Sequence, residues 1–340
     1  MREKSANPVV GMSEHVRKYL IVYTLLSVIL AIPIGDYFEE YVVTNGAFLS
    51  NAVVFFAVLT IYPSMIQLRT EGLVKIFRLW KPIVAFFFYV FFLSPVISFT
   101  LAPTFGNPQV GVGFVIGNAV PVSSAALGYV LIAGGSIELA TALAVISLIA
   151  AMPVVPFIIG LYSTQASMSI PVNSIVTSVF YILVLPFLAG QLTRYVLVKS
   201  RGSNFVNKSV RPYLSVATML SMFALVFVLV AREAGLMVTK PLIVGQVILY
   251  QAFIILCVLL LSLSVSWLTH SSYEDHQALA FTSVTKNQSV AAAIATLALG
   301  PTAALAPAII PIIQPILAIA YIHAEKSVAS LLAVKNDAEA

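Results

Sequence analysis

The chain has 340 residues, of which 60% are hydrophobic and only 9% are charged, whereas soluble domains carry about 25% charged residues. This composition indicates a polytopic membrane protein and argues against two soluble domains. The formal net charge of +5 does not indicate nucleic-acid binding, because the basic residues lie in loops beside apolar segments. The single cysteine, Cys257, excludes an intramolecular disulfide and a CxxC metal site.

About ten apolar stretches are each near the 20 residues that a membrane-spanning helix needs. In chain order the predicted spans cover residues 19–36, 47–68, 82–102, 109–133, 138–162, 172–197, 212–232, 241–268, 276–299 and 302–324. No linker is long enough to separate domains. We therefore expect one transmembrane domain over residues 1–325 and a disordered cytoplasmic tail over residues 326–340.

The basic residues predict the orientation of these spans in the cell membrane. With the N-terminus in the cytoplasm, most of the 18 basic residues lie in cytoplasmic loops. Arg232 and Lys240 fall outside, and Lys286 lies within a span. The first outer loop is acidic instead. This asymmetry fits an even number of spans with both termini in the cytoplasm.

The two halves of the chain repeat a weak pattern. Lys81-Pro is echoed by Lys240-Pro, and Pro156 is echoed by Pro315, at the same offset along the chain. Because each half holds five predicted spans, the second copy must be inverted across the membrane. Lys81 is then inside and Lys240 outside, as the charge distribution already requires.

Repeat one covers about residues 19–162, and repeat two covers about residues 172–324. Inverted repeats are typical of secondary transporters, which place their binding site where broken helices of the two halves meet. The fold predicted from the sequence is therefore all-α, with ten transmembrane helices in two inverted five-helix repeats. Helices four and nine are expected to be discontinuous and to cross.

The ninth predicted span contains a polar run, TSVTKNQS, at residues 282–289. Lys286 is the one charged residue that the sequence places near mid-membrane, where a cation costs a few kcal/mol and is functional by default. Backbone leaves a helix at that depth only where protein or a water-filled cavity covers it. We interpret the run as a helix break. The alternative is a cytoplasmic loop between two shorter spans, with Lys286 as a static countercharge or extending to a nearby interface.

The fourth predicted span carries a matching break at Pro121-Val-Ser-Ser124. Pro121 removes one helix hydrogen bond and clashes with the preceding turn. Under the repeat offset, Ser123 pairs with Thr282, close to the polar run of the ninth span. The alternative is a proline kink with no role in ligand binding.

Hydroxyl and amide side chains near the two breaks are the candidate substrate ligands. They are Ser123, Ser124, Thr285, Asn287, Gln288, Ser289 and Gln314. For Gln314, a helix–helix hydrogen bond is an equally good interpretation. Lys286 is the candidate coupling residue, and Pro121 is the candidate helix-breaking residue.

No pattern of side chains indicates an enzyme. An intramembrane hydrolase needs paired Asp residues, a Ser–His or Cys–His pair, or HExxH inside a span, and none is present. His270, His276 and His323 lie near span ends. Asp275 and His276 are expected at a solvated helix start, because no His or Cys partner has metal-ligand spacing. We expect no metal and no cofactor.

Several local patterns resemble one transporter superfamily, which holds the bile acid:sodium symporters and the arsenite permeases. Residues 61–69 (IYPSMIQLR), 214–220 (LSVATML) and 308–315 (AIIPIIQP) resemble the second, seventh and tenth helices of arsenite permeases. Lys286-Asn287 resembles the ninth-helix crossover of the whole superfamily. The resemblance covers about residues 15–325 and implies ten spans in two inverted repeats, with helices four and nine unwound where they cross.

The chain also departs from both branches of that superfamily. Its sodium symporters have an acidic residue and a Gln-Asn pair in the ninth helix, where this chain has Thr282 and Lys286-Asn287. Their Ser-Asn pair in the fourth helix is matched by Ala126-Leu127. Loss of a carboxylate and gain of an ammonium argue against sodium coupling. The arsenite branch has a fourth-helix cysteine that is absent here, and usually a glutamate where this chain has Gln314.

These features predict a secondary transporter that moves a small anion or a neutral oxyacid by alternating access. Burial disfavours the charged form of a lysine, so Lys286 is expected to exchange a proton in place of a coupling sodium ion. Arsenite efflux, in the arsenical-resistance branch, is one candidate activity. The alternatives are sodium-dependent uptake of an organic anion, and a channel or a non-transporting sensor. The expected partners are a small-molecule substrate and the lipid bilayer, and the oligomeric state is left open.

Overall fold

The computed structural model describes residues 8–68, 80–165 and 170–337. In these ranges the regular structure is helical, apart from one isolated β-bridge. In chain order the α-helices are α1 (Pro8–Lys18), α2 (Leu20–Tyr37), α3 (Glu39–Thr44), α4 (Gly46–Gln67), α5 (Trp80–Phe87), α6 (Ser94–Leu101), α7 (Pro108–Ala119), α8 (Ala125–Ile132), α9 (Ile137–Gln165), α10 (Val172–Val179), α11 (Leu185–Arg201), α12 (Arg211–Arg232), α13 (Ala234–Thr239), α14 (Pro241–Leu268), α15 (Tyr273–Val284), α16 (Gln288–Leu299), α17 (Pro301–His323) and α18 (Glu325–Asp337).

Membrane-length helices confirm the prediction of a polytopic α-helical protein. Within the described residues, 7 helices are long and apolar enough to cross a membrane, or up to 8 if the bent pair of α1 and α2 is one span. The predicted fourth and ninth spans are each split into two short helices, α7 with α8 and α15 with α16. None of these four is long enough to cross alone. The ten-span inverted repeat stays a prediction.

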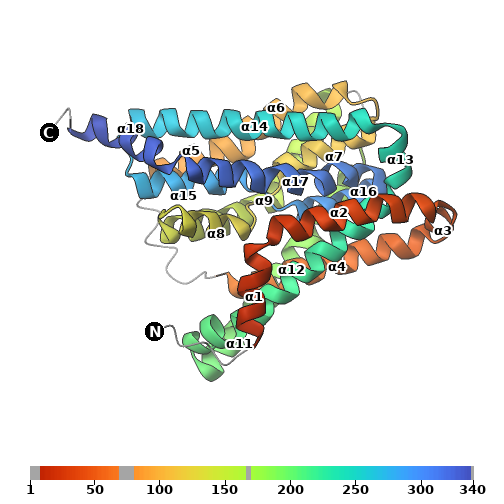
Figure 1. The fold of residues 1–340 in the computed structure, drawn as a ribbon, viewed down its shortest axis with the longest axis horizontal. Coiled ribbons are helices and arrows are strands. Elements are labelled where there is room, and N and C mark those ends of the chain that lie inside the picture. Colours follow the sequence, from red (N-terminus) through yellow and green to blue (C-terminus); the bar gives the residue numbers. More distant parts are fainter. Residues whose placement is uncertain (1–7, 69–79, 166–169, 338–340) are drawn as a thin grey trace.

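The helices form two groups that are joined at one end of the molecule (Figure 1). In one group α12 packs on α2 and α4, and α11 packs on α4, whereas α7, α14, α16 and α17 form the other group. The groups lie closest near α3 and α13, and they diverge toward the end that carries both chain termini. The site described below lies between them.

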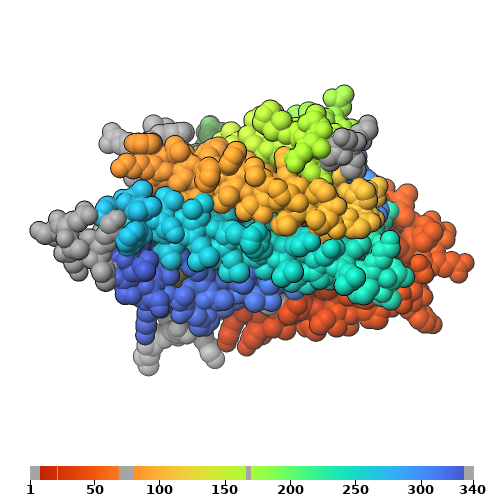
Figure 2. Space-filling view, turned by 90° about the horizontal axis from the view of Figure 1, so that it is seen from above, coloured from red at the N-terminus to blue at the C-terminus, as the bar shows by residue number. Residues whose placement is uncertain are grey.

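One face of the molecule shows the apolar surface expected of a protein in lipid. Helix α14 runs along this face between the segment around α5 and α6 and the C-terminal α17 (Figure 2). Large apolar side chains of α14 are exposed, among them Leu242 at 81%, Leu249 at 66% and Leu260 at 65%. Contiguous exposed apolar surface of this kind marks contact with a membrane or a partner.

Among the described residues, three π-helical segments interrupt the long helices, and each is followed by a proline. These are η2 (Phe88–Leu93), η4 (Phe180–Val184) and η5 (Phe205–Val210), with Pro95, Pro186 and Pro212 in the first turn of the helices that follow. In a π-helix the N–H of residue i+5 donates to the carbonyl of residue i, as Ser94 does to Tyr89. The next donor would be Pro95, which has no N–H. The carbonyl of Val90 is therefore left without its helical partner.

The C-terminal segment contains one further helix. We expected disorder over residues 326–340; in the structure Glu325–Asp337 forms α18, and residues 338–340 lie outside the described residues. Val328 and Leu332 are buried there, and the helix packs on α14, α15 and α17. These two apolar side chains are four residues apart, so they lie on the same face of the helix. They form a short apolar stripe within a tail whose other residues are largely charged or small.

Close packing of α7 on α17 depends on a glycine. A Cβ atom at Gly113 would collide with the carbonyl oxygen of Ala303. Small residues of this kind let helix backbones approach each other in membranes. Because α7 and α17 both lead to the site, this contact fixes the distance between two of its walls.

We predict that Gly113→Ala markedly lowers the thermal stability and the folded yield of the protein in detergent. The added methyl group must displace backbone, which typically costs about 1–3 kcal/mol and sometimes more. Gly128→Ala is the matched control, because a Cβ at Gly128 in α8 meets nothing within 4 Å. Equal stability of the two variants would contradict the packing described here.

A buried carboxyl joins the two groups of helices at their closed end. Glu233 lies between α12 and α13, beyond the end of the long helix, and is 8% exposed. Burial raises the pKa of its carboxyl to about 6, against the opposing effects of a hydrogen bond from Thr302 in α17 and the charge of Arg232. Arg232 in turn donates to the Ser50 hydroxyl on α4.

We predict that Glu233 makes the fold less stable as the pH rises. The pKa of the Glu233 carboxyl is about 6 in the folded protein, above its ordinary value of 4.5. Protonation of Glu233 therefore stabilises the folded state fully below about pH 4.5, and this stabilisation is lost as the pH rises through about 6. The difference is at most about 2 kcal/mol. Glu233→Gln should remove much of the fall in unfolding temperature between about pH 5 and about pH 8. The exposed Glu40 offers the control Glu40→Gln, and an unchanged pH dependence in Glu233→Gln would refute this assignment.

Candidate functional site

The two helix breaks meet and pair through their backbones. Val122 and Lys286 form an antiparallel β-bridge. On one side of it, the Ser123 N–H donates to the Thr285 carbonyl over 2.9 Å, and on the other the Asn287 N–H donates to the Pro121 carbonyl over 2.8 Å. The breaks predicted in the fourth and ninth spans are therefore present, and they lie against each other.

Local sequence explains why each helix stops at this point. The residue before a proline is driven to extended backbone, and Val120 before Pro121 has ψ 160°. At the start of α16, the Asn287 side chain caps the helix by accepting from the Val290 N–H over 3.3 Å. An unpaired backbone N–H or C=O group is energetically costly in an apolar membrane interior. Each break supplies hydrogen-bond partners for the backbone of the other.

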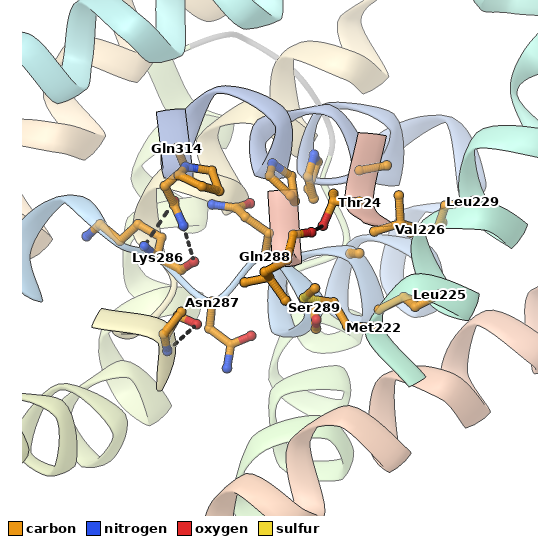
Figure 3. Close-up of a pocket in the computed structure, with 18 of the residues that line it drawn as sticks. Thr24, Met222, Leu225, Val226, Leu229, Lys286, Asn287, Gln288, Ser289 and Gln314 are labelled. Carbon is orange, nitrogen blue, oxygen red and sulfur yellow. Dashed lines mark hydrogen bonds between the residues drawn. The ribbon is translucent and has the colours of Figure 1, made fainter. Parts of the chain in front are cut away.

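The Lys286 amine points away from the pocket between the helix groups (Figure 3). The side chain is 2% exposed. Its Nζ donates to the Val90 carbonyl over 2.9 Å and lies 5.8 Å from the centre of the Phe91 ring. That carbonyl is the one released by Pro95 at the end of η2. The charged group predicted near mid-membrane is thus buried, and it is held by a π-helical carbonyl and an aromatic face.

Gln314 holds the backbone of Lys286 from both sides. The Lys286 N–H donates to Gln314 Oε1 over 3.1 Å, and Gln314 Nε2 donates to the Lys286 carbonyl over 3.2 Å. Figure 3 shows both bonds, with Gln314 extending from α17 onto the crossover. From the sequence, one interpretation of Gln314 is a helix–helix hydrogen bond. Gln314 does make such bonds, and its partner is the backbone of the second break at Lys286.

Gln288 connects the second break to the end of α7. Its Nε2 donates to the Gly117 carbonyl over 3.0 Å, while its Oε1 is buried without a hydrogen-bond partner. A Cβ at Gly117 would lie 3.0 Å from that Oε1 and 2.9 Å from Ile310 Cδ1. Glycine at 117 therefore makes room for the glutamine side chain.

A pocket of about 70 Å³ lies on the side of the crossover opposite the Lys286 amine. It holds a few water molecules or a solute of similar size. Its polar wall joins five of the predicted residues, and Lys286 contributes to the lining as well; the five are Ser123, Asn287, Gln288, Ser289 and Gln314. Two predicted residues lie outside this wall. Ser124 is the exposed N-cap residue of α8, and Thr285 is fully buried with an unpartnered hydroxyl.

The other wall of the pocket comes from residues that the sequence analysis did not single out. They are Leu20 and Thr24 of α2 and Met222, Leu225, Val226 and Leu229 of α12. Apolar side chains in an apolar span carry no signal that distinguishes a pocket wall from a lipid-facing surface. The hydroxyl of Thr24 donates to its own helix, to the Leu20 carbonyl.

One expectation about the helix start at α15 is wrong. We expected Asp275 and His276 at a solvated start, but His276 is 0% exposed. Its Nδ1 lies 2.9 Å from the Ser266 hydroxyl and its Nε2 lies 2.8 Å from the Tyr321 hydroxyl. Packing of α15 against α14 and α17 covers the ring. Within the described part of the chain, no cluster of three or more His, Cys, Asp or Glu residues could hold a metal ion.

Comparison with known proteins assigns this architecture to a family. The model of the Sodium Bile acid symporter family matches residues 54–240, which is more than half of the chain. The match includes the first break and ends before the second. No curated protein matches the chain. Members of this family are membrane transporters, and the apolar helices agree with a multi-pass membrane protein. The chain belongs to the Sodium Bile acid symporter family.

Proposed function

We propose that this chain is a secondary active transporter for a small anion or a neutral oxyacid, coupled to protons through Lys286 and not to sodium. The observation that carries the proposal is the buried Lys286 amine, 2.9 Å from the Val90 carbonyl, at the crossing of two broken helices. When protonated, this amine would bring a positive charge to the crossover, as a bound coupling cation would. Residues 1–325 would form the transport domain.

The topology we propose has ten crossings. The seven membrane-length helices found in the described residues, together with α2 and the two split spans, would supply them. Pairing of the two breaks supports an arrangement of two inverted five-helix repeats, in which each repeat contributes one discontinuous helix. With both termini in the cytoplasm, the end at which the helix groups diverge faces the cytoplasm (Figure 1). Rocking of one group against the other would then expose the pocket to the opposite side.

The chemistry of the pocket favours an anion or a neutral hydroxyl compound over a metal cation. Among the described residues, no carboxylate lines it. The amides of Asn287, Gln288 and Gln314 and the hydroxyls of Ser123 and Ser289 supply neutral donors and acceptors. The N-terminus of α16 begins at Gln288 and adds partial positive charge. A volume of about 70 Å³ suits a solute of a few heavy atoms.

Arsenous acid fits these requirements as a small neutral oxyacid, and small carboxylates fit them as anions. The alternative of sodium-dependent uptake of an organic anion keeps the same fold. It requires an oxygen-rich cation site at the crossover, where this chain places the Lys286 ammonium. A channel or a sensor would need neither the paired breaks nor a coupling residue.

We predict that purified protein in proteoliposomes accelerates uptake of labelled arsenous acid or of small organic anions, in response to an imposed pH gradient. Replacing sodium with choline should leave the rate unchanged. Preloaded unlabelled substrate should produce transient counterflow, which a channel cannot do. Sodium-dependent flux without a response to pH would instead support the organic-anion alternative.

We further predict that Lys286→Gln and Lys286→Ala lower this flux by about tenfold or more, as expected for loss of a charge-assisted hydrogen bond, and abolish its dependence on pH. Lys240→Gln is the control, because Lys240 is an exposed basic residue before α14. Unchanged flux and an unchanged pH profile in the Lys286 variants would rule out the proton-carrier role.

A further inference from the structure

A second polar cluster lies behind the crossover, apart from the substrate pocket. Ser94 of α6, Asn118 of α7, Gln251 of α14 and Ser283 of α15 line a small space together with Lys286. This space is too narrow to hold a water molecule. Lys286 lines both this space and the substrate pocket. Among the described residues, it is the one that the two linings share.

The orientation of Asn118 in this cluster is fixed by its hydrogen bonds. Asn118 Nδ2 donates to the Phe114 carbonyl and to Gln251 Oε1, both over 3.0 Å. Both side chains are buried, with Asn118 at 0% and Gln251 at 1% exposure. Both bonds are made by the amide nitrogen of Asn118, so neither partner contacts the amide oxygen Oδ1.

Two acceptors of the cluster lack a donor. Asn118 Oδ1 and the Ser283 hydroxyl oxygen are buried and have no hydrogen-bond partner, and Ser283 is 0% exposed. A buried acceptor without a donor destabilises the folded state. With no room for water, a donor to these oxygens comes from the protein itself. Lys286 lines the same space, and its ammonium has three N–H groups, of which the Val90 carbonyl takes one.

We propose that Asn118 and Ser283 form a second acceptor position for the Lys286 ammonium, and that Gln251 is the residue that positions Asn118. This inference rests on the proposed function, because it assigns the place to which the coupling amine moves during transport. In the structure the amine is bonded to η2. In the other position it would be bonded to α7 and α15.

The last turn of α7 connects this position to the substrate pocket. Asn118 directly follows Gly117, whose carbonyl accepts from Gln288 Nε2 over 3.0 Å. Gln288 lines the substrate pocket. Movement of the Lys286 ammonium from Val90 to Asn118 would therefore affect the last turn of α7, to which the pocket residue Gln288 is hydrogen-bonded. This gives a physical route by which the charge of Lys286 and the occupation of the pocket affect each other.

The test compares pH profiles of arsenous acid and organic-anion flux in proteoliposomes for Asn118→Asp, Asn118→Leu and Ser283→Ala. A carboxylate beside the ammonium stabilises it, so Asn118→Asp should move the profile about one pH unit higher, a tenfold change in proton affinity. Asn118→Leu and Ser283→Ala should move it lower. Gln251→Leu should resemble Asn118→Leu with a smaller shift. Thr296→Val is the control, because Thr296 also has a buried unpartnered hydroxyl but lines neither cavity.

Where a variant transports too slowly for its flux to be measured, a double-mutant cycle of Asn118→Leu and Lys286→Gln provides a second test, with thermal unfolding in detergent as the readout. Asn118→Leu should change the pH dependence of unfolding in the wild-type background and leave it unchanged in Lys286→Gln. Coinciding pH profiles for wild type, Asn118→Asp and Asn118→Leu, or equal effects of Asn118→Leu in both backgrounds, would overturn the inference.

The two proposals fail differently. Persistence of the pH dependence in Lys286→Gln would refute the proposed coupling role itself. Loss of that dependence in Lys286→Gln, together with unshifted profiles in the Asn118 variants, would refute the second acceptor position alone. A requirement for sodium that Asn118→Leu removes would show that a small cation occupies the cluster instead, and would also overturn the inference.

Discussion

The structure depends on the backbone pairing of two interrupted helices. Peptide groups that leave a helix in an apolar membrane interior cost several kcal/mol each unless they find partners. Here the Ser123 N–H and the Asn287 N–H bond to carbonyls of the opposite break, over 2.9 Å and 2.8 Å. Neither break would be stable alone. Their pairing lets irregular backbone exist at this depth and fixes the position of Lys286 between them.

Three further contacts hold the crossover in place, and each has a local cause. Gln314 of α17 bonds the peptide groups on both sides of Lys286. Gln288 reaches the last turn of α7, where Gly117 leaves room for it. The Val90 carbonyl is available to the ammonium because Pro95 cannot donate to it. The pocket residues Gln288 and Gln314 and the buried Lys286 side chain therefore share one set of supports.

Sequence patterns predicted the helices and the two helix breaks, because these depend on local residue chemistry and on depth in the membrane. Apolar runs located the helices to within a few residues, and Pro121 and the polar run around Lys286 located both breaks. The direction of the Lys286 amine could not be predicted, because it depends on a carbonyl that a proline releases far away in the chain. The apolar pocket wall of α12, such as Leu225, resembles any other apolar helix face. Burial of His276 depends on packing of α14 and α17 around it, and no local pattern at the start of α15 reveals that.

The most direct test of this account is a disulfide across the crossover. The bonds on either side of Val122 and Lys286 make them a pair with Cα atoms about 4.5 Å apart, which suits a disulfide. In a Cys257→Ser background, Val122→Cys with Lys286→Cys should cross-link under mild oxidation and keep the two halves joined after cleavage at a protease site inserted between them. Val122→Cys with Thr296→Cys, about 15 Å further along α16, should not cross-link. Absence of the first cross-link, or equal cross-linking of both pairs, would contradict the paired breaks on which the proposed transport site depends.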